Sequence, residues 1–412
     1  MTDKEFFKVT SLGTVLELIC TFPCVSEEIL PLDQCAGRIL SQDITSQIDL
    51  PEFNRATMDG YAVQARSTFG ASETIPALFT VVGTVEMGKV PTVSVRAGEA
   101  VQIATGGMLP DGADSVVMVE YTQALDEHTI EIFKSAAPLQ HVMEIGEDFY
   151  REQKVFSKGN RIRPQEMGVL AALGKTGVPV YRQPVVAIIS SGDEIIPIEQ
   201  TPGLSQLRDV NSYTLTGLVR LSGGVPLYLG IARDNFDEVD RFCRNALQQA
   251  DMVLISGGSS VGSRDFTLEV IKGLPDSEIL VHGVSISPGK PTILARSKQK
   301  AIWGLPGQVT SAMVVFHVMV RPMLEAIGGL SGDRLGAAHE VPAVLSRNLA
   351  SVQGREDFVR TKVVYRKNRV YAEPLLGKSG LIHTMVKADG LIRIDMNSEG
   401  LDKGSPVRVI LF

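Results

Sequence analysis

The stretch DMVLISGGSSVGSRD, residues 251–265, joins a short apolar run to a loop rich in glycine and serine. The apolar run, 251–256, predicts a buried strand. The loop contains residues that permit tight turns or supply hydroxyl donors, namely Gly257, Gly258, Ser259, Ser260 and Gly262. It leads into a predicted helix, and Asp265 lies where that helix begins. Free N–H groups at a helix start favour a bound phosphate or other oxyanion, so the stretch predicts an anion site at a strand end.

An alternation of apolar strands and helices surrounds this stretch. Further buried strands are predicted over 184–190, 225–232 and 301–305, and helices over 215–224, 235–250, 265–274 and 310–329. In the helix over 235–250, Asn235 is a predicted N-cap and Glu238 completes a capping box. Strands that alternate with helices in this way predict a mostly parallel, doubly wound α/β sheet.

The chain on either side of the sheet follows other patterns. A short amphipathic helix is predicted over 10–22 and a second helical piece over 26–40. Within 47–147, short alternating runs between Gly, Pro and Asp turns predict a β-rich domain. A helix is predicted over 160–175, and the strand-like runs near the C-terminus predict a β domain there.

Composition narrows the class of protein. The 412 residues carry a net charge of −7, which argues against broad nucleic-acid binding, because that needs a basic surface. No signal peptide is visible, and no apolar run reaches about 18 residues, so a soluble cytoplasmic protein without membrane contact is expected. The four cysteines and six histidines are scattered, and no pattern among them completes a metal or redox site.

Three loops leave the carboxyl ends of predicted strands, where a doubly wound sheet binds its ligands. They span 189–195, 255–265 and 304–312. Each loop alone is explained equally well as a turn that needs glycine, but three on one sheet edge predict an anion site. A GxxxxGK[ST] phosphate loop is absent from the sequence, so an ordinary P-loop nucleotidase is not indicated.

Acidic residues follow the strands of the same sheet. They are Asp193, Glu194, Asp234 and Asp265. Clustered carboxylate oxygens near a phosphate site suit Mg²⁺, although each residue taken singly also fits a helix cap or a solvated turn, and Asp193 fits a turn best. Lys290, between a Gly and a Pro, could be a fixed cation that anchors an anion; a solvated surface lysine is the alternative.

Longer motifs extend along nearly the whole chain. They read LPEFNRATMDGYAV (50–63), GEDF (146–149), SSGDEI (190–195), SGGSSVGSRDF (256–266), SPGKPTILA (287–295), GLPGQVTSA (304–312) and GKSGLIHTMVKADGLIRI (377–394). In this order they closely resemble the molybdopterin molybdotransferases, or molybdenum insertases. The resemblance implies insertion of molybdate at the dithiolene sulfurs of adenylylated molybdopterin, with release of AMP assisted by Mg²⁺. It also implies a homodimer, and contact with molybdopterin adenylyltransferase and cofactor-accepting enzymes.

The resemblance implies a subunit of four domains. An α/β pterin-binding domain, related in fold to molybdopterin adenylyltransferases, would comprise 1–27 and 176–328. An elongated connecting and dimerisation segment would comprise 28–46 and 148–175. The β-rich domain would be 47–147, and the C-terminal β domain 329–412.

The resemblance also implies roles for individual residues. Catalytic positions would be Asp59, Asp148, Glu194, Asp234 and Asp265, of which the last three would also hold Mg²⁺. Binding positions would be Thr105, Gly192, Gly257, Gly258, Ser259, Ser260, Gly262, Lys290, Pro306, Gly307, Arg355, Arg360 and Ser379. Lys290, either Arg355 or Arg360, and Ser379 would lie near the molybdate oxygens, since a tetrahedral dianion needs fixed cations and hydroxyl donors. Asp59 would reach the cleft of the partner subunit.

Two motifs depart from the family pattern. Ser287 stands where the family often has Lys, and Gln308 and Val309 stand where it often has Asn-Pro. Both lie near the expected oxyanion pocket and leave the choice between molybdate and tungstate open.

Two other functions stay open on the sequence. Adenylyl transfer to molybdopterin is one, because the sheet domain has the related fold, although that activity does not need the β-rich and C-terminal domains. The other is a pterin-binding scaffold or carrier without turnover.

Overall fold

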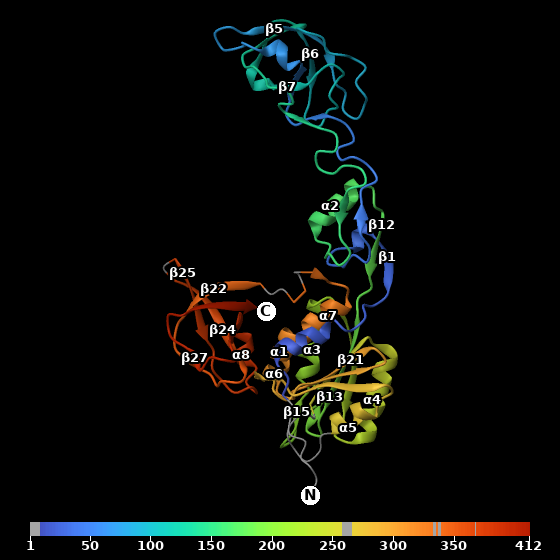
Figure 1. Cartoon of the computed structure of the whole chain (residues 1–412), viewed down its shortest axis with the longest axis vertical. Coiled ribbons are helices and arrows are strands. Elements are labelled where there is room, and N and C mark those ends of the chain that lie inside the picture. Colours follow the sequence, from blue (N-terminus) through green and yellow to red (C-terminus); the bar gives the residue numbers. More distant parts are fainter. Residues whose placement is uncertain (1–8, 258–265, 333–334, 337–338, 367) are drawn as a thin grey trace. The chain divides into compact units, whose positions relative to one another are not determined.

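The computed structural model describes residues 9–257, 266–332, 335–336, 339–366 and 368–412, and Figure 1 gives their elements. The chain divides into two compact units. The first comprises Met1–Gln42, Lys158–Arg163 and Gly177–Phe412, and the second comprises Asp43–Ser157 and Pro164–Thr176. The second unit is therefore inserted into the sequence of the first as two stretches.

A six-stranded sheet forms the centre of the first unit. Its order is β16 (Val225–Ala232), β13 (Val185–Ser191), β17 (Met252–Ser256), β21 (Lys300–Leu305), β20 (Ile293–Ser297) and β18 (Ser277–His282). The first four strands run parallel, β20 is antiparallel to β21, and β18 is antiparallel to β20, so only β20 is reversed relative to the other five. The predicted, mostly parallel α/β sheet is confirmed.

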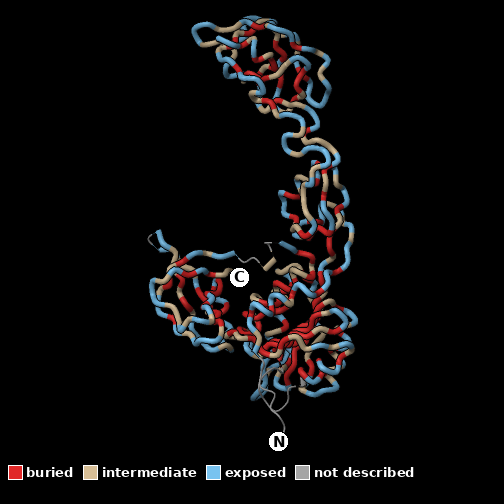
Figure 2. Tube along the Cα trace, viewed as in Figure 1, coloured by how far each residue is buried: buried red, intermediate tan, exposed pale blue. Residues whose placement is uncertain are grey.

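Helices cover both faces of this sheet, as alternating side chains of its strands require. On β13, Val186 and Ile188 pack into one core, whereas Ala187 and Ile189 pack into the other. The helices of the first core are α1 (Leu12–Ile19), α3 (Asn211–Leu221), α6 (Val309–Val315) and α7 (Arg321–Ile327). Those of the second are α4 (Phe236–Gln249) and α5 (Phe266–Gly273). Figure 2 shows buried residues gathered in this domain.

The start of α4 only half fulfils the predicted capping box. Asn235 is the N-cap, and its side-chain oxygen accepts a 2.9 Å hydrogen bond from the Glu238 N–H. The Glu238 carboxylate does not bond back to the main chain, because Oε2 accepts from the Asn235 side-chain amide at 3.4 Å. The predicted N-cap, Asn235, thus accepts a hydrogen bond from one of the free N–H groups at the start of the helix.

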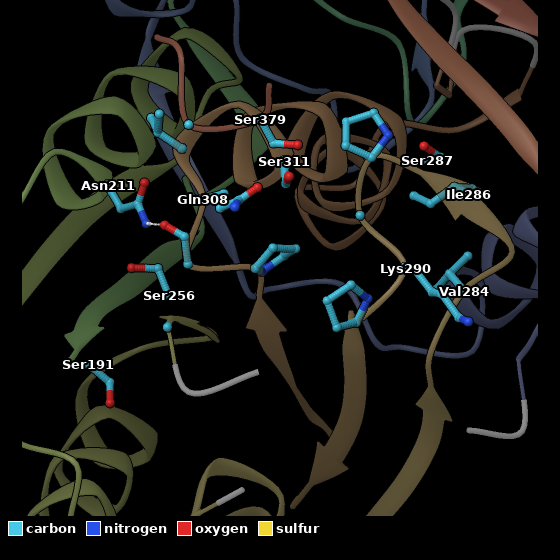
Figure 3. A pocket seen from close by; sticks show the side chains of 18 of the residues that line it. Ser191, Asn211, Ser256, Val284, Ile286, Ser287, Lys290, Gln308, Ser311 and Ser379 are labelled. Atoms are coloured by element: carbon cyan, nitrogen blue, oxygen red, sulfur yellow. Dashed lines mark hydrogen bonds between the residues drawn. The ribbon is translucent and has the colours of Figure 1, made fainter. Parts of the chain in front are cut away.

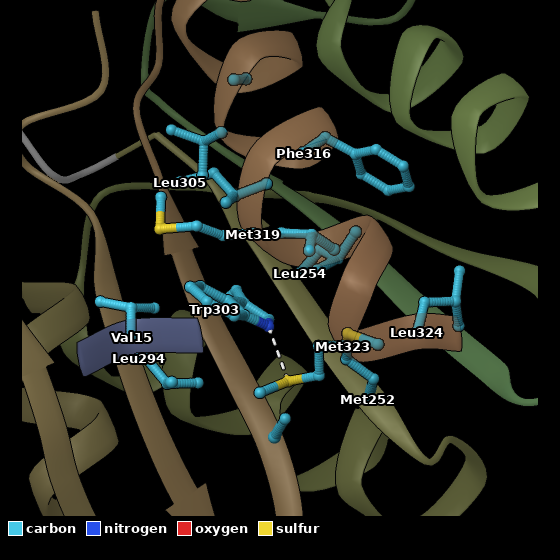
Figure 4. Packing of buried hydrophobic residues seen from close by; sticks show 14 of the residues in the cluster. Val15, Met252, Leu254, Leu294, Trp303, Leu305, Phe316, Met319, Met323 and Leu324 are labelled. Atoms are coloured by element: carbon cyan, nitrogen blue, oxygen red, sulfur yellow. Dashed lines mark hydrogen bonds between the residues drawn. The ribbon is translucent and has the colours of Figure 1, made fainter. Parts of the chain in front are cut away.

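One continuous helix spans Val309–Ile327, with a π-helical turn, η4 (Phe316–Val320), between α6 and α7. With a mean hydropathy of 1.3, it is the one helix in the described ranges that is long and apolar enough to cross a membrane. Its most apolar window is 67% buried inside this domain, including Phe316, Met319 and Met323 in the first core. It is therefore a core helix, and Figure 4 shows it packed on the sheet.

The predicted helical piece over 26–40 is wrong. Residues Glu27–Pro31 form strand β1, followed by a 3-10 turn, Leu32–Gln34. Strand β1 pairs antiparallel with β12 (Gly177–Tyr181). Pro31 lacks the N–H that a residue in a helix interior needs. The main-chain groups of β1 instead form hydrogen bonds with β12, which lies far away in the sequence.

The C-terminal part of the first unit forms a second six-stranded sheet. Its order is β19 (Ile286–Ser287), β24 (Glu356–Arg366), β25 (Arg369–Pro374), β22 (Glu340–Leu345), β28 (Pro406–Leu411) and β26 (Gly390–Ile394). An added β24–β26 pairing closes the last five strands on themselves. Strand β19 belongs to the segment after β18, so it joins the α/β part to the C-terminal sheet by pairing Ile286 with Glu356 and Ser287 with Asp357.

The second unit is rich in strands, as predicted. Its sheet has the order β7 (Ser115–Met118), β4 (Gly60–Val63), β6 (Glu99–Ile103), β5 (Ala77–Thr84), β9 (Thr129–Ile132) and β8 (Thr122–Ala124). Two short strand pairs join the chain before this sheet to the chain after it. They are β2 (Ile44–Thr45) with β11 (Lys154–Phe156), and β3 (Arg55–Ala56) with β10 (Val142–Met143). The predicted helix over 160–175 is observed as α2, Pro164–Ala172.

We expect Met323→Ala to destabilise the α/β core by about 2–5 kcal/mol, because it opens a cavity against fully buried Trp303. It also removes the sulfur that accepts the Trp303 Nε1–H bond at 3.2 Å, drawn in Figure 4. Trp303 is the only tryptophan, so its emission during urea unfolding reports on this core. Leu221→Ala, at an exposed position on α3, is the control and should change little. Equal shifts in the two variants would contradict this description of the core.

Candidate functional site

A cavity of about 1400 Å³ opens at the carboxyl ends of β13, β17 and β21. Its floor comes from the three loops singled out in the sequence, including Ser191, Gly257 and Gly307. Every described residue that lines it belongs to the first unit. Its position at the ends of parallel strands is where open α/β sheets bind ligands, and it is large enough for a ligand of dinucleotide size.

Gly257 determines how closely the three strand ends approach one another. Its φ is +112°, and a Cβ atom there would lie 2.1 Å from the Ser191 carbonyl oxygen. Its N–H donates to the Leu305 carbonyl at 3.3 Å. Because no side chain fits between β13 and β17 at this point, glycine is required for the floor of the cavity.

Two predicted acids, Glu194 and Asp234, line the cavity. Asp234 Oδ1 accepts a 2.6 Å hydrogen bond from the Ser191 hydroxyl. The Glu194 carboxylate lies over Gly192, where an added Cβ would come within 2.9 Å of Oε2. Asp193 accepts from the Asp234 N–H at 3.2 Å, so its carboxylate holds the turn, in line with its predicted role.

Sequence reasoning missed a second polar cluster on the cavity wall, built around Asp209. This carboxylate is 2% exposed and accepts from the Ser190 hydroxyl at 2.9 Å, the Ser212 N–H at 3.1 Å and the Tyr228 hydroxyl at 3.0 Å. Burial, and then the Asp209 charge, raise the pKa of Tyr228 well above its usual value. The signal in the sequence was an Asp and an Asn just before a helix, a pattern typical of a helix start.

Asn211 ties two of the cavity loops together. Its side-chain amide donates to the Gly307 carbonyl at 2.8 Å, the bond drawn in Figure 3. This contact fixes the loop between β21 and α6 against the start of α3.

The opposite wall carries cations and hydroxyls. Figure 3 shows Ser287 and Lys290 on one side of the cavity and Ser191 and Ser256 on the other. The β19–β24 pairing brings Arg355 of the C-terminal sheet to the same cavity. Arg355 Nε lies 3.0 Å from Asp357 Oδ1, while Asp357 Oδ2 accepts from Ser351 at 2.7 Å. The Arg355 guanidinium is therefore ion-paired with a carboxylate that is itself hydrogen-bonded to Ser351.

The positions that depart from the family pattern, Ser287, Gln308 and Val309, all line this cavity. Pro306 and Ser379, two of the predicted binding positions, line it too. The Ser379 carbonyl accepts from the Thr310 N–H at 3.2 Å and also from the Thr310 hydroxyl, at the first turn of α6.

Arg360 is not among the described residues that line the cavity. It is buried, and it donates to the Gly377 carbonyl at 2.6 Å and to the Thr384 hydroxyl at 2.9 Å. Burial lowers the pKa of its guanidinium. Of the two arginines in GREDFVR, only Arg355 therefore faces the cavity in this structure.

Three predicted residues lie in the second unit. Asp59 Oδ1 accepts from the Thr105 N–H at 2.7 Å and from the Thr105 hydroxyl at 2.8 Å. These two bonds, the main-chain one first, lower the pKa of Asp59. Asp148 is exposed, and its N–H donates to the Leu50 carbonyl at 3.0 Å. The structure thus pairs Asp59 with Thr105 and places Asp148 separately.

The remaining predicted residues, Gly258, Ser259, Ser260, Gly262 and Asp265, lie outside the described residues. Of the predicted Mg²⁺ ligands, Glu194 and Asp234 line the cavity. Within the described ranges, no group of three or more His, Cys, Asp or Glu side chains could hold a metal ion.

Three family profiles match successive parts of the chain. They are the MoeA N-terminal region (domain I and II) over 10–174, a probable molybdopterin binding domain over 187–326, and the MoeA C-terminal region (domain IV) over 342–412. A putative molybdopterin biosynthesis protein of Methanocaldococcus jannaschii is 36% identical, with 92% of this chain and 90% of that protein covered. The molybdopterin molybdenumtransferase of Bacillus subtilis is 30% identical, with 95% and 92% covered.

Solved structures agree with this grouping. A molybdopterin biosynthesis MoeA protein from Pyrococcus horikoshii superimposes with a TM-score of 0.85 at 29% identity, covering 98% of this chain and all of that one. A second structure of a Pyrococcus MoeA protein gives a TM-score of 0.79 at 36% identity over 98% of this chain and 99% of the other. Full-length similarity in sequence and fold shows that the chain belongs to the MoeA family of molybdopterin molybdenumtransferases.

Proposed function

We propose that this protein is a molybdopterin molybdotransferase, which inserts molybdate into adenylylated molybdopterin and releases AMP. The main support for this function is that one cavity has two chemically different walls. Glu194 and Asp234 lie at the strand ends, whereas Lys290 and Arg355 come from the other side. A pyrophosphate-bearing pterin and a metal oxyanion are two anions that such a cavity suits, and the names of the relatives support this substrate pair.

The cationic wall is the proposed receptor for molybdate. Lys290 and Arg355 supply positive charge, and Ser287 and Ser379 supply hydroxyl donors. A tetrahedral dianion is bound best by charge-assisted hydrogen bonds, and the Arg355 guanidinium, which is ion-paired with Asp357, has donors for such bonds. Ser287 would supply a hydroxyl where relatives often have a second cation, which is why the preference for molybdate or tungstate needs direct measurement.

The strand-end wall is the proposed receptor for pterin and pyrophosphate. Main chain at Gly257, Pro306 and Gly307 allows close approach of a ligand. Gly192 is not among the described residues that line the cavity, and it is proposed for this wall on the strength of the resemblance alone. Gly258, Ser259, Ser260 and Gly262 continue this wall in our proposal, on the strength of the resemblance. Holding both substrates in one cavity removes much of the entropic cost of their encounter.

Glu194 and Asp234 would hold Mg²⁺ beside the pyrophosphate, because carboxylate oxygens are the ligands that this cation prefers. Asp265 is proposed as the third ligand on the strength of the resemblance alone. Bound Mg²⁺ would supply charge neutralisation for the leaving AMP. The Ser191 hydroxyl orients Asp234, so one oxygen of that carboxylate is fixed and the other is available to a metal.

The remaining proposals concern assembly. We propose a cytoplasmic homodimer in which Asp59 and Thr105, already bonded to each other, and Asp148 complete the cavity of the partner subunit. We also propose the four-domain division at 1–27 with 176–328, 28–46 with 148–175, 47–147 and 329–412. Transient contact with molybdopterin adenylyltransferase and with cofactor-accepting enzymes would pass the labile pterin along.

An assay with purified protein, adenylylated molybdopterin, Mg²⁺ and molybdate tests the proposal. Release of AMP that depends on molybdate is the expected result. Binding of the pterin without AMP release would identify a carrier instead, and consumption of ATP with unmodified molybdopterin would identify an adenylyltransferase. Tungstate in a parallel reaction measures the oxyanion preference.

We expect Asp234→Asn to slow AMP release by about 10–100-fold while pterin binding persists. The amide can still accept from Ser191, but it loses the charge that a metal ligand needs. Asp237→Asn, on an exposed acid in the first turn of α4, is the matched control. Similar rates for the two variants would rule out Asp234 as a metal ligand.

We expect Arg355→Gln to raise the half-saturating molybdate concentration about tenfold, equivalent to about 1.4 kcal/mol, through loss of one charge-assisted contact. Arg366→Gln breaks the pair between Arg366 on β24 and Glu373 on the neighbouring strand β25, and it serves as control. Titration of AMP release against molybdate measures both. An unchanged half-saturation in Arg355→Gln would place the oxyanion elsewhere.

A further inference from the structure

The inference concerns the wall loop, residues 375–382, which carries Ser379 and Gly380 into the cavity. We infer that Arg360 is a positioning residue and not a ligand of the oxyanion. It holds the wall loop from the C-terminal domain, while the α/β domain holds the same loop from the other side. The inference deepens the proposed function and rests on it for its catalytic consequence.

Arg360 holds the wall loop from the interior of the C-terminal sheet. Its guanidinium donates to the Gly377 carbonyl at 2.6 Å and to the Thr384 hydroxyl at 2.9 Å. Thr384 passes the contact on, because the same hydroxyl donates to the Leu381 carbonyl at 2.6 Å. The Arg360 carbonyl also accepts from the Leu375 N–H at 2.8 Å. One residue thus fixes the loop near both of its ends.

The middle of the wall loop is fixed by the other domain. The Ser379 carbonyl accepts from the N–H and the hydroxyl of Thr310, which is fully buried in the first turn of α6. In Figure 3, Ser379 lies near Ser311 of the same turn, and both line the cavity. Arg360 and Thr310 therefore hold the same loop from opposite sides, one from each domain.

This clamp sets the separation between the two walls. The strand-end wall belongs to the α/β sheet, whereas Arg355 and Ser379 belong to the C-terminal sheet region. Molybdate bound on one must reach a pterin bound on the other, and a misplacement of about 1 Å costs about 10²-fold in rate. A loosened clamp should therefore lower the turnover rate more than it weakens binding of either substrate.

The test uses Arg360→Met, Thr310→Val and the double variant of the full-length protein. Each single variant should lower kcat for molybdate-dependent AMP release by about tenfold or more and leave the half-saturating molybdate concentration within about twofold. The double variant should be little worse than the poorer single variant, because both changes release one loop. Arg408→Met, which removes an exposed arginine pair with Glu340 in the same domain, is the matched control.

Limited trypsin digestion gives a readout that does not need turnover. Lys378 lies in the wall loop, so cleavage after it, measured against cleavage after exposed Lys403, should become faster in Arg360→Met and Thr310→Val but not in Arg408→Met. Trp303 emission checks that each variant is folded. If Arg360→Met fails to fold, Thr310→Val carries the test.

The outcomes separate the inference from the proposed function. A half-saturating molybdate concentration raised at least about tenfold in Arg360→Met, with Lys378 cleavage unchanged, would make Arg360 an oxyanion ligand and overturn the inference. If the unaltered protein releases no AMP, the proposed function fails, and the cleavage rates alone decide: faster cleavage after Lys378 supports the clamp, and unchanged cleavage refutes it.

Discussion

The close main-chain contact at Gly257 is the constraint on which the cavity depends. The glycine lies against the Ser191 carbonyl and donates to the Leu305 carbonyl, so the ends of β13, β17 and β21 meet without an intervening side chain. Any Cβ there would push β13 and β17 apart and carry Ser191, and with it Asp234, away from its present place. Ligand chemistry at this edge thus follows from a packing requirement on one residue.

Acids and cations reach the cavity from different elements: Glu194 and Asp234 follow strands of the α/β sheet, Lys290 follows β19, and Arg355 comes from the C-terminal domain. Carboxylates and cations that lie side by side offset part of each other's charge, as Asp357 does for Arg355. Placed on facing walls, they leave room for ligands that are themselves anionic. The short β19–β24 pairing is the element that brings the cationic wall into position.

Local patterns in the sequence predicted the α/β sheet, its loops and Asp234, because each depends on periodicity or on position after a strand. Strand β1 was missed because its partner, β12, lies far away in sequence. Asp209 was missed because its partners Ser190 and Tyr228 come from separate strands. Arg355 and Arg360 share one motif, and only tertiary packing distinguishes the one that faces the cavity from the one that is buried.

The interrupted order of the first unit affects how the nascent chain can fold on the ribosome. Helix α1 packs in the same core as α7, which is synthesised roughly 300 residues later, a delay of about 15–60 s at ~5–20 residues per second. The inserted second unit is complete well before that moment. During translation, the apolar face of α1 therefore stays exposed to water, or bound by a chaperone, until α7 has been synthesised. The inserted second unit can complete its fold before then.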